Sequence, residues 1–532
     1  MSLSVGKPKV VSVFTPDLTV NAPKEYVSVR GPTDKTTKVF TSTSYSPSSI
    51  TFNLDVPSPK IIVQRNVLLE MSVQLDFTGS GTGNLLQVGV NDAPRAFPIQ
   101  QVMSNIQAQI DNITCNVANL PDFFDALSRY HMSPKQRGKF QSLTPSMGDQ
   151  FQDYADWVTY GSSRNPLNSY GNSIQEEDAR GGFADLTVVS NTNTTASVQM
   201  VVREPLGFLA PFVFSDTSDE MGFYNVQNFQ FTFSLGNISN AFWSHASSGN
   251  TISSITATLF AAPRMMMTFS TPPDIMPISL PIKYPYYQVN RYVNSDISIS
   301  SGSSSTITFN NVQLNSIPQK MYLFAFRRPQ DRTFLTSNSY ASIESISIDF
   351  NNRSGILASA SKQQLYNIAL QNDLQMSYNQ FSKYVGSVLC LEFGRDIPLG
   401  DLDAPGKLGT FQLSPTVTFK NQSGSTVVYT PYMVTVSEGI FTITKDLKTQ
   451  EIGILSSQDV LNAKPEIGVT YAKVENASGG DLISGLKKLI KLGKDSYEIG
   501  SEIGESIAPF LLDKEKEGGK LLQREELRRV RK

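Results

Sequence analysis

The sequence predicts an all-β protein built from two β-sandwiches in tandem. Charged residues make up 17% of the 532-residue chain, whereas an average soluble protein has roughly 25%. Aromatic residues stay at 10%, and Ser, Thr, Asn, Gln, Gly and Pro replace the missing charge. This mixture favours short strands with uncharged polar faces over long helices. A proline-rich segment divides the chain, and the strand pattern found before it returns after it.

Residues 1–48 show no sustained periodicity and are predicted to form an N-terminal arm. The first sandwich is predicted over 49–270, where alternating apolar residues indicate strands in ITFNLDVP, VLLEMSVQLDF and SNIQAQIDNITCNV. The last of these contains an Asp111-Asn112 turn, and PDFFDALSRY follows it as a short helix in a loop. Residues 133–182 are polar and turn-rich, which indicates a surface insertion.

Five prolines in the segment 271–287 predict a linker, because proline fixes φ and has no N–H to donate within a helix or central strand. The second sandwich is predicted over 288–445. Its segment SIESISIDFNN repeats the alternation and the Asp/Asn-rich turn of SNIQAQIDN, and a second helix pattern, KQQLYNIALQND, follows it. Strands are expected again in SVLCLEF, TFQLSPTVTF, VVYTPYMVTV and IFTITK. The similar order of elements indicates duplication of one sandwich.

Residues 446–532 are predicted to be a C-terminal extension with an amphipathic helix. After the break NASGG, apolar residues share one helical stripe that lysines largely avoid; the stripe contains Leu482, Ile483, Leu486, Leu489 and Ile490. Two interpretations stay open, since such a helix either docks on a partner or acts on a membrane surface. Gly479 and Gly480 are the expected processing site, because a glycine pair fits an extended protease groove.

Charge and cysteine content exclude some classes of protein. The net charge of −2 argues against sequence-specific binding of nucleic acid. Cys115 and Cys390 are the only cysteines, which indicates folding in a reducing compartment. The first residues lack the apolar core of a signal peptide, and no run approaches the ~20 apolar residues of a transmembrane helix. We therefore expect a soluble protein, made in the cytosol, with no cofactor.

The sequence contains no recognisable catalytic motif, so we expect no enzymatic activity. His131 ends the first helix candidate and His245 lies in the loop sequence WSHASSG. Both are better explained as surface or capping residues than as members of a catalytic triad. With only two histidines and two cysteines, placed singly, the chain has no spacing typical of zinc sites. No metal is expected.

Four further clusters have an ordinary structural explanation. The glycines of TGSGTG are followed by no Gly-Lys-Ser/Thr and are expected in a hairpin rather than a phosphate loop. The acidic pair in GDLDAPG suits calcium but is expected in a turn, and the acidic run IQEED is expected in a solvated loop. The methionine run is expected to fill a core or interface gap. The residues concerned are Gly79, Gly81, Gly83; Asp401, Asp403; Glu176, Glu177, Asp178; and Met265, Met266, Met267.

The duplicated pattern split by TPPDIMPISLPIKYP, and the passage SVLCLEFGRDIPLGDLDAPGKLGTFQLSPTVTF through YMVTVSEGIFTI, resemble a known family. Over roughly 45–445 the chain is similar to the double jelly-roll major capsid proteins of the adenovirus–tectivirus lineage. It looks closest to those of virophages, polinton-like viruses and adintoviruses. In those proteins a turn rich in Gly, Asp and Pro precedes the last paired strands of the second jelly roll, and the segment from Asp401 to Gly409 has the same character.

The resemblance implies a major capsid protein of an icosahedral DNA virus, located in the virion and made in the host cytoplasm. It implies homotrimers whose six jelly rolls form a pseudo-hexagonal tile, with neighbouring trimers, penton and minor capsid proteins as partners. The tail from Gly479 resembles peptides that adenovirus-like particles release after Gly-Gly sequences, and implies a transient membrane contact. However, Ala477 and Ser478 precede the glycine pair, where a larger aliphatic residue is expected.

Three alternative functions share this composition. A β-sandwich spike or adhesin would not need halves of matching topology. A single-jelly-roll capsid protein with a protruding domain would have only one half of this fold. A β-sandwich glycosidase would need a pair of carboxylates, and the chain has many from which to choose.

Overall fold

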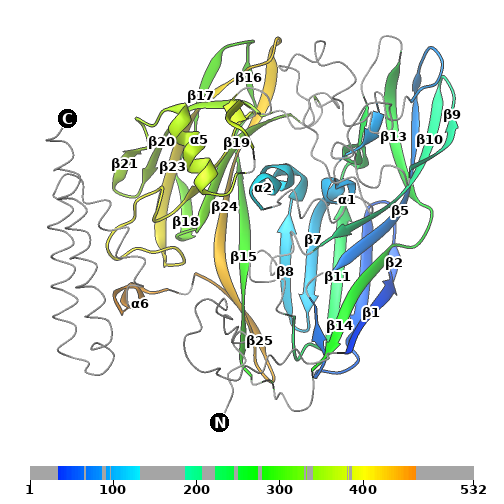
Figure 1. Ribbon diagram of the computed structural model, residues 1–532, viewed down its shortest axis with the longest axis horizontal. Coiled ribbons are helices and arrows are strands. Elements are labelled where there is room, and N and C mark those ends of the chain that lie inside the picture. The colour runs from blue at the N-terminus through cyan, green and yellow to red at the C-terminus, as the bar shows by residue number, and fades with distance from the viewer. Residues whose placement is uncertain are drawn as a thin grey trace, which may run out of the picture. The chain divides into compact units, whose positions relative to one another are not determined.

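A computed structural model shows that the chain is mostly β-structure, as predicted (Figure 1). The structure describes residues 34–64, 67–86, 92–95, 97–131, 186–206, 222–244, 250–272, 278, 280–328, 331, 340–374, 376–379, 381–382, 386–453 and 455–462. Within these residues no helix is long and apolar enough to cross a membrane.

The first sandwich contains two antiparallel sheets. In one, the order is β1 (Asp34–Thr41), β14 (Arg264–Thr271), β5 (Leu68–Ser80), β10 (Thr195–Pro205) and β9 (Leu186–Asn191), with β13 (Thr251–Leu259) on β5 and β4 (Ile62–Val63) on β14. In the other, the order is β2 (Ser44–Tyr45), β3 (Ser49–Asp55), β11 (Asn228–Leu235), β7 (Met103–Ile110) and β8 (Ile113–Ala118). The short elements between strands are α1 (Pro98–Val102), η2 (Leu120–Asp122), α2 (Phe124–His131), η8 (Ile238–Ala241) and the pair β6 (Asp92–Pro94)–β12 (Phe242–Ser244).

The second sandwich also contains two antiparallel sheets. One has the order β15 (Ile282–Val293), β24 (Val427–Ile443), β19 (Lys320–Arg327) and β22 (Val388–Glu392), with β16 (Ile297–Ile299) and β25 (Lys448–Ile452) on β24. The other has the order β17 (Ser304–Thr308), β23 (Leu408–Lys420), β20 (Ser342–Phe350) and β21 (Arg353–Ile356), with β18 (Val312–Ser316) on β23. The helix α5 (Lys362–Gln371) follows β21, and α6 (Ser457–Asn462) follows β25.

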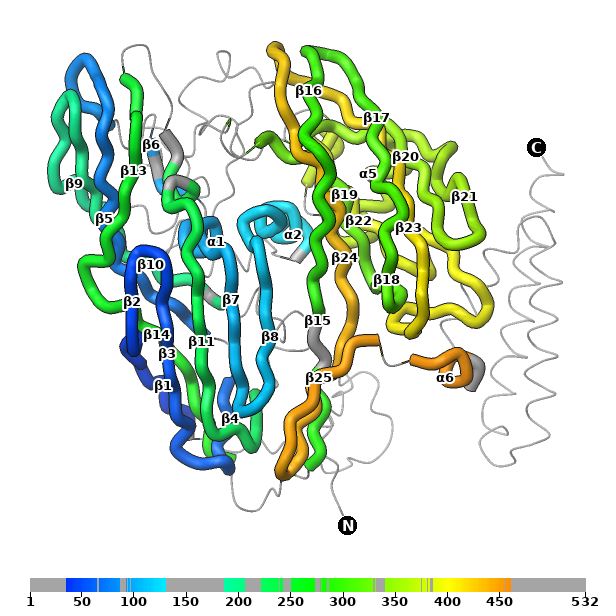
Figure 2. Tube along the Cα trace, turned by 180° about the vertical axis from the view of Figure 1, so that it is seen from behind, coloured from blue at the N-terminus to red at the C-terminus, as the bar shows by residue number. Residues whose placement is uncertain are grey.

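The two sandwiches have the same strand order, which confirms the predicted duplication. The path β1-β14-β5-β10 corresponds to β15-β24-β19-β22, and β3-β11-β7-β8 corresponds to β17-β23-β20-β21. Each is a pair of interleaved four-stranded sheets, the arrangement of a jelly roll. The short helices α2 and α5 each follow the last strand of the second path (Figure 2). The fold is therefore a double jelly roll with short helices in its loops.

The period of two in the sequence determines which side chains form each core. Ile50, Phe52 and Leu54 of β3 are almost fully buried, whereas Asn53 and Asp55 between and after them are exposed. In β23, Leu413 and Val417 are buried in the second core in the same way. Burying such side chains supplies the main favourable free energy of folding.

One hairpin turn is built alike in both sandwiches. Asp111 joins β7 to β8 with φ of 49°, and Asn351 joins β20 to β21 with φ of 51°. Asp and Asn tolerate this left-handed region better than most residues. The Oδ1 atom of Asp111 accepts hydrogen bonds from the backbone of β11 and the residue before it, and Oδ1 of Asn351 accepts one from Gln412 of β23. The two turn residues noted in the sequence therefore also bind each hairpin to the neighbouring strand through their side-chain oxygens.

The structure places strands in three segments where none was expected. Within the predicted N-terminal arm 1–48, β1 pairs with β14 and β2 pairs with β3. The strand β15 starts at Ile282, within the predicted linker 271–287, and includes Pro285. Pro285 is tolerated because β15 lies at the edge of its sheet and has only β24 as a neighbour, so the strand has no second partner to which an N–H would have to donate. Beyond the predicted end of the second sandwich at 445, β25 adds to β24 through Lys448–Ile452.

Candidate functional site at the interface between the sandwiches

The helix α2 of the first sandwich packs against strands of the second. The Tyr130 hydroxyl donates a hydrogen bond to the carbonyl oxygen of Val388 and accepts one from the Cys390 N–H at 3.1 Å. Arg129 donates to the Gly386 carbonyl at 3.3 Å, and its guanidinium lies 4.1 Å from the centroid of the Tyr340 ring. These bonds satisfy the polar groups that α2 brings to the second sandwich, while Asp125 of the same helix pairs with Arg95 and accepts a hydrogen bond from Gln101 in the first sandwich.

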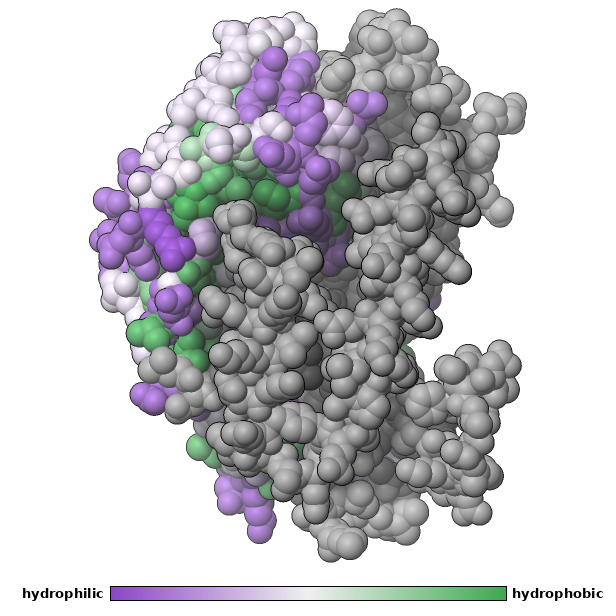
Figure 3. Space-filling model, turned by 60° about the vertical axis from the view of Figure 1, so that its left-hand side comes forward, coloured by the Kyte–Doolittle hydropathy of each residue, from purple (hydrophilic) through white to green (hydrophobic). Residues whose placement is uncertain are grey.

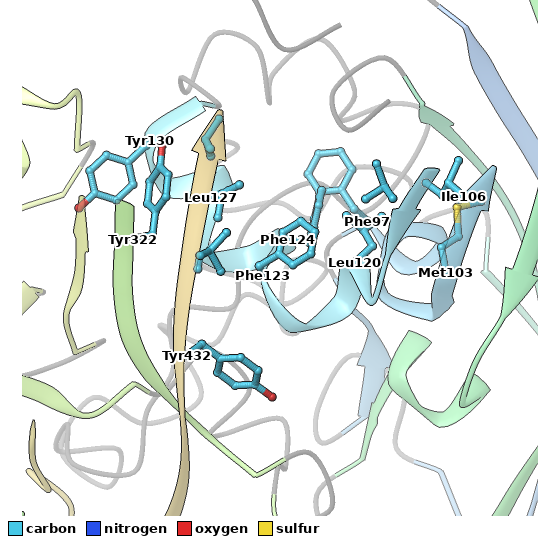
Figure 4. Close-up of a cluster of buried hydrophobic side chains, with 14 of the residues drawn as sticks. Phe97, Met103, Ile106, Leu120, Phe123, Phe124, Leu127, Tyr130, Tyr322 and Tyr432 are labelled. Carbon is cyan, nitrogen blue, oxygen red and sulfur yellow. The ribbon is translucent and has the colours of Figure 1, made fainter. Parts of the chain in front are cut away.

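Aromatic side chains continue from the first core through α2 to the second sandwich (Figure 4). The Phe97 and Phe124 ring centroids lie 5.6 Å apart, and those of Tyr130 and Tyr322 lie 5.4 Å apart, both in edge-on contacts. The strand β19 presents Tyr322 to α2, while Met321 beside it points to the opposite face. The outer face of the sheet that contains β19 and β22 is thus covered by α2 of the first sandwich.

A glycine is required where β22 approaches this contact. Gly386 has φ of +83°, and a Cβ atom there would lie 1.9 Å from the Tyr340 carbonyl oxygen. Both the backbone conformation and the close approach therefore exclude a side chain. Because the Gly386 carbonyl also accepts from Arg129, the interface depends on this backbone position.

Three polar contacts lie around the aromatic row. The Asp111 carboxylate and the Lys448 ammonium form a 2.7 Å ion pair in which the two side chains are 13% and 8% exposed. Nearby, the Cys115 thiol donates to Gln450 Oε1 at 3.4 Å. Asp122 forms an ion pair with Arg291 of β15. The contact between β8 and β25 therefore includes a nearly buried charge pair, which requires well-formed geometry to offset desolvation.

A second group of contacts lies beside β15 and the end of β24. Asn225 donates through Nδ2 to the carbonyl oxygens of Thr444 at 2.9 Å and Lys445 at 3.1 Å. The Tyr284 hydroxyl donates to the Gly222 carbonyl at 3.0 Å, and the Phe223 ring lies against Tyr284. We define the inter-sandwich interface by these contacts together with those of α2 and β25.

Burial favours the neutral form of the tyrosine hydroxyls and cysteine thiols in the inter-sandwich interface. It raises the pKa of Tyr130 and of Tyr322 well above the usual value. The nearby Cys390 thiol adds to the effect on both, whereas the hydrogen bond from the Cys390 N–H lowers the pKa of Tyr130. Burial also raises the pKa of Cys115 and of Cys390 to about 12. The thiols are therefore protonated at neutral pH, and a protonated buried thiol is a poor nucleophile. The geometry suits a permanent structural contact rather than chemistry.

The residues singled out in the sequence do not converge on one site. Gly479, Gly480 and the stripe from Leu482 to Ile490 lie outside the described residues, as do His245 and the acidic run at 176–178. His131 is the last residue of α2. In the described ranges, no three His, Cys, Asp or Glu residues are grouped so that they could hold a metal ion.

The other clusters have structural roles. Met265 and Met267 are buried in the first core, as expected of gap-filling side chains. Asp401 lies in a turn, and Asp403 pairs with Lys407 at 2.7 Å. A Cβ atom on Gly79 would lie 2.1 Å from the Thr251 carbonyl oxygen, so this glycine is explained by the close approach of β13. None of these arrangements resembles a ligand site.

Sequence reasoning missed the residues of the inter-sandwich interface. Tyr130 and Val388 are 258 residues apart in the sequence, and Asp111 was noted only as part of a turn. A weak signal existed for α2. Phe123, Phe124, Leu127 and Tyr130 give it four large apolar side chains within eight residues, more than a short loop helix needs.

Two jelly rolls of equal strand order with a shared buried interface define a double jelly-roll protein, the class to which the chain belongs by its fold. Residues 8–272 match the family model of the Sputnik virophage major capsid protein 1st domain. Residues 286–385 and 382–439 match that of the major capsid protein V20 C-terminal domain. The "Putative capsid protein V20" of Sputnik virophage is 32% identical over 544 residues, covering 95% of this chain and 90% of that protein.

Solved structures agree with the sequence relatives. The 3.5 Å cryo-EM structure of the Sputnik virophage is similar with a TM-score of 0.76 and 30% identity, over 90% of this chain and 100% of that one. The crystal structure of mavirus major capsid protein shares the fold, with a TM-score of 0.68 and 14% identity over 88% of this chain and 99% of that one.

The chain belongs to the virophage major capsid protein family. It is a structural protein that assembles with copies of itself into the shell of the virion, and it is not an enzyme. Membership of this family replaces the spike, adhesin and glycosidase alternatives. The second jelly roll excludes a single-jelly-roll capsid protein.

Proposed function

We propose that three copies of the chain close into a ring of six jelly rolls, a pseudo-hexagonal tile of an icosahedral shell. The observation that carries this proposal is the equal strand order of the two sandwiches. Two similar units joined by a buried interface can occupy successive positions around a ring, so that three chains supply six equivalent corners. The predicted units, 49–270 and 288–445, are the corners of this tile. The two family models support that division, since one ends at 272 and the other begins at 286.

Sedimentation and electron microscopy of the purified chain test the tile. We expect one species with three times the chain mass of 58.5 kDa and particles with a six-cornered outline. A stable monomer at micromolar concentration would contradict the proposal.

Neighbouring tiles, penton and minor capsid proteins are the proposed partners, and pull-down from assembled particles checks them. Both cysteines are free and buried, which supports synthesis in the reducing host cytoplasm.

The C-terminal extension is proposed to act apart from the shell, either facing its interior or released by cleavage near Gly480. The apolar stripe with flanking lysines supports contact with an anionic membrane surface. A synthetic 481–512 peptide should gain helix on anionic vesicles and release their contents, and failure of both excludes the membrane role. If deleting 481–532 abolishes the trimer, the extension instead locks neighbouring subunits together.

A further inference from the structure

The strand β25 is an addition to the duplicated fold. Along one side of β24, β19 is the neighbour as far as Val436, and β25 is the neighbour from Gly439 to Ile443. In the first sandwich the corresponding strand β14 has β5 and then the two-residue strand β4 on the same side. The strand β4 comes from within its own jelly roll, between β3 and β5, whereas β25 follows the last strand of the second jelly roll. The second sandwich therefore fills this position with a segment from outside the repeated unit.

The hairpin formed by β24 and β25 contacts the first sandwich at three points. On β25, Lys448 forms the nearly buried ion pair with Asp111. In the turn of the hairpin, two backbone carbonyl oxygens accept hydrogen bonds from the side chain of Asn225. On β24, the ring centroid of Phe441 lies 5.8 Å from that of Phe223. The hairpin thus belongs to the sheet of one jelly roll while its side chains and turn bind the other.

Beyond β25 the chain is attached to the second sandwich again. The Leu455 N–H donates to the Gly406 carbonyl oxygen at 3.1 Å, and the Leu455 carbonyl oxygen accepts from the Leu408 N–H at 2.9 Å. Between these two positions Lys407 forms its ion pair with Asp403. The acidic turn noted in the sequence therefore anchors the segment that follows β25. With β24 on one side and this turn at its end, β25 is fixed to the second sandwich along its length.

We propose that β25 is a clasp that fixes the angle between the two jelly rolls. The other attachment point is α2, a short helix that binds the backbone around β22 through Tyr130 and Arg129. Figure 1 and Figure 2 both place α2 at mid-height and β25 at the lower end of the molecule. A single attachment leaves two packed units free to rotate about it as about a hinge, and a second attachment at a distance removes that freedom. The inference concerns one chain and does not depend on the proposed trimer.

The clasp-release variant Asp111→Asn/Lys448→Met/Asn225→Gly tests this proposal. It removes the ion pair and both hydrogen bonds of the Asn225 side chain. The backbone conformation is kept, because Asn351 has the same positive φ at the corresponding turn of the second sandwich. Glycine likewise adopts the φ of 60° found at residue 225.

The matched control is Thr449→Val/Glu451→Gln, which changes the alternate side chains of β25, on the face opposite Lys448. Pulsed electron paramagnetic resonance measures the angle through spin labels on Asn53→Cys and Ser304→Cys, exposed positions on the corresponding strands β3 and β17. The native thiols are buried, and co-expression with an excess of unmodified chain leaves one labelled copy in most assemblies. Figure 3 shows the side that carries the second sandwich, where the upper described surface is intermediate to hydrophilic, as a solvent-exposed label requires.

We expect a narrow distribution of label-to-label distances in the unmodified chain and in the control. In the clasp-release variant the distribution should roughly double in width, because the sandwiches then rotate about α2. Hydrogen exchange separates this release from a general loss of stability. The amides of 448–452 should exchange faster in the variant, while the Cys390 amide, which is bound to Tyr130, keeps its rate.

Two results would overturn the clasp. One is a distance distribution as narrow as that of the control while the amides of 448–452 exchange faster. The other is an equal acceleration at Cys390, since the two attachments would then open as one. If the triple variant gives no folded protein, Asn225→Gly alone takes its place, with a smaller broadening expected and an unchanged distribution counting against the proposal.

Discussion

Asp111 and Lys448 lie 337 positions apart in the sequence (448 − 111), yet their side chains form a 2.7 Å ion pair that is almost closed to solvent. Asp111 lies in the turn between β7 and β8 of the first sandwich, and Lys448 is the first residue of β25 in the second. The pair joins the hairpin of one jelly roll to the last described strand of the other. The residue that forms the predicted turn therefore also helps to hold the two sandwiches together.

We expect Lys448→Met to destabilise the chain by about 3 kcal/mol, because it leaves the Asp111 charge nearly buried and without its cation. Chemical denaturation followed by fluorescence measures the loss. Combining it with Asp111→Asn should cost less than the sum of the single changes, since both remove one interaction. Lys445→Met, on an exposed neighbouring side chain, should change stability by less than about 0.5 kcal/mol. Equal losses for Lys448→Met and Lys445→Met would mean that the ion pair contributes nothing.

Tyr130→Phe should destabilise the interface by about 1–3 kcal/mol. The change removes the hydroxyl that donates to Val388 and accepts from Cys390, so it leaves two buried backbone groups unsatisfied. Tyr45→Phe is the control, because the Tyr45 side chain is 46% exposed. Hydrogen exchange should show faster exchange at the Cys390 amide in Tyr130→Phe. Unchanged exchange there would argue against the hydrogen bond.

Gly386→Ala should prevent recovery of soluble folded protein. The methyl group would meet the Tyr340 carbonyl oxygen, and alanine is strained at the positive φ of this residue. Gly424→Ala is the matched control, since nothing lies within 4 Å of a Cβ there. Soluble yield and melting temperature compare the two. A Gly386→Ala protein with the stability of Gly424→Ala would show that β22 does not approach Tyr340 this closely.

Both thiols should resist labelling until the chain unfolds. Burial raises the pKa of Cys115 and Cys390 from 9.0 to about 12, so the folded state favours the protonated form. This contribution to stability is complete below about pH 9 and is lost as pH rises from 9 toward 12, by up to about 1.4 kcal/mol per pH unit for each thiol. Reaction with a thiol reagent at pH 8, with and without denaturant, measures protection. Denaturation midpoints at pH 8 to 10.5 measure the slope, and rapid labelling of the folded chain would contradict the burial.

The sequence alone determined the elements and their repetition. Alternation in SNIQAQIDN and SIESISIDFNN predicted β7 and β20, and the Asp/Asn pairs after them predicted turns that the structure contains. Strands, tight turns and short helices depend on residues close together in the chain, so local patterns carry enough information. The same local logic failed at Pro285, because proline is excluded from a central strand and not from the edge strand β15.

Only the tertiary structure decided what each sandwich packs against. A period of two shows which face of a strand is buried, but it does not name the partner that buries it. Tyr130, Asp111 and Asn225 were ordinary helix and turn residues until the fold brought them to Val388, Lys448 and Thr444. These contacts join residues more than 200 positions apart, and their free energy depends on geometry that no local pattern contains.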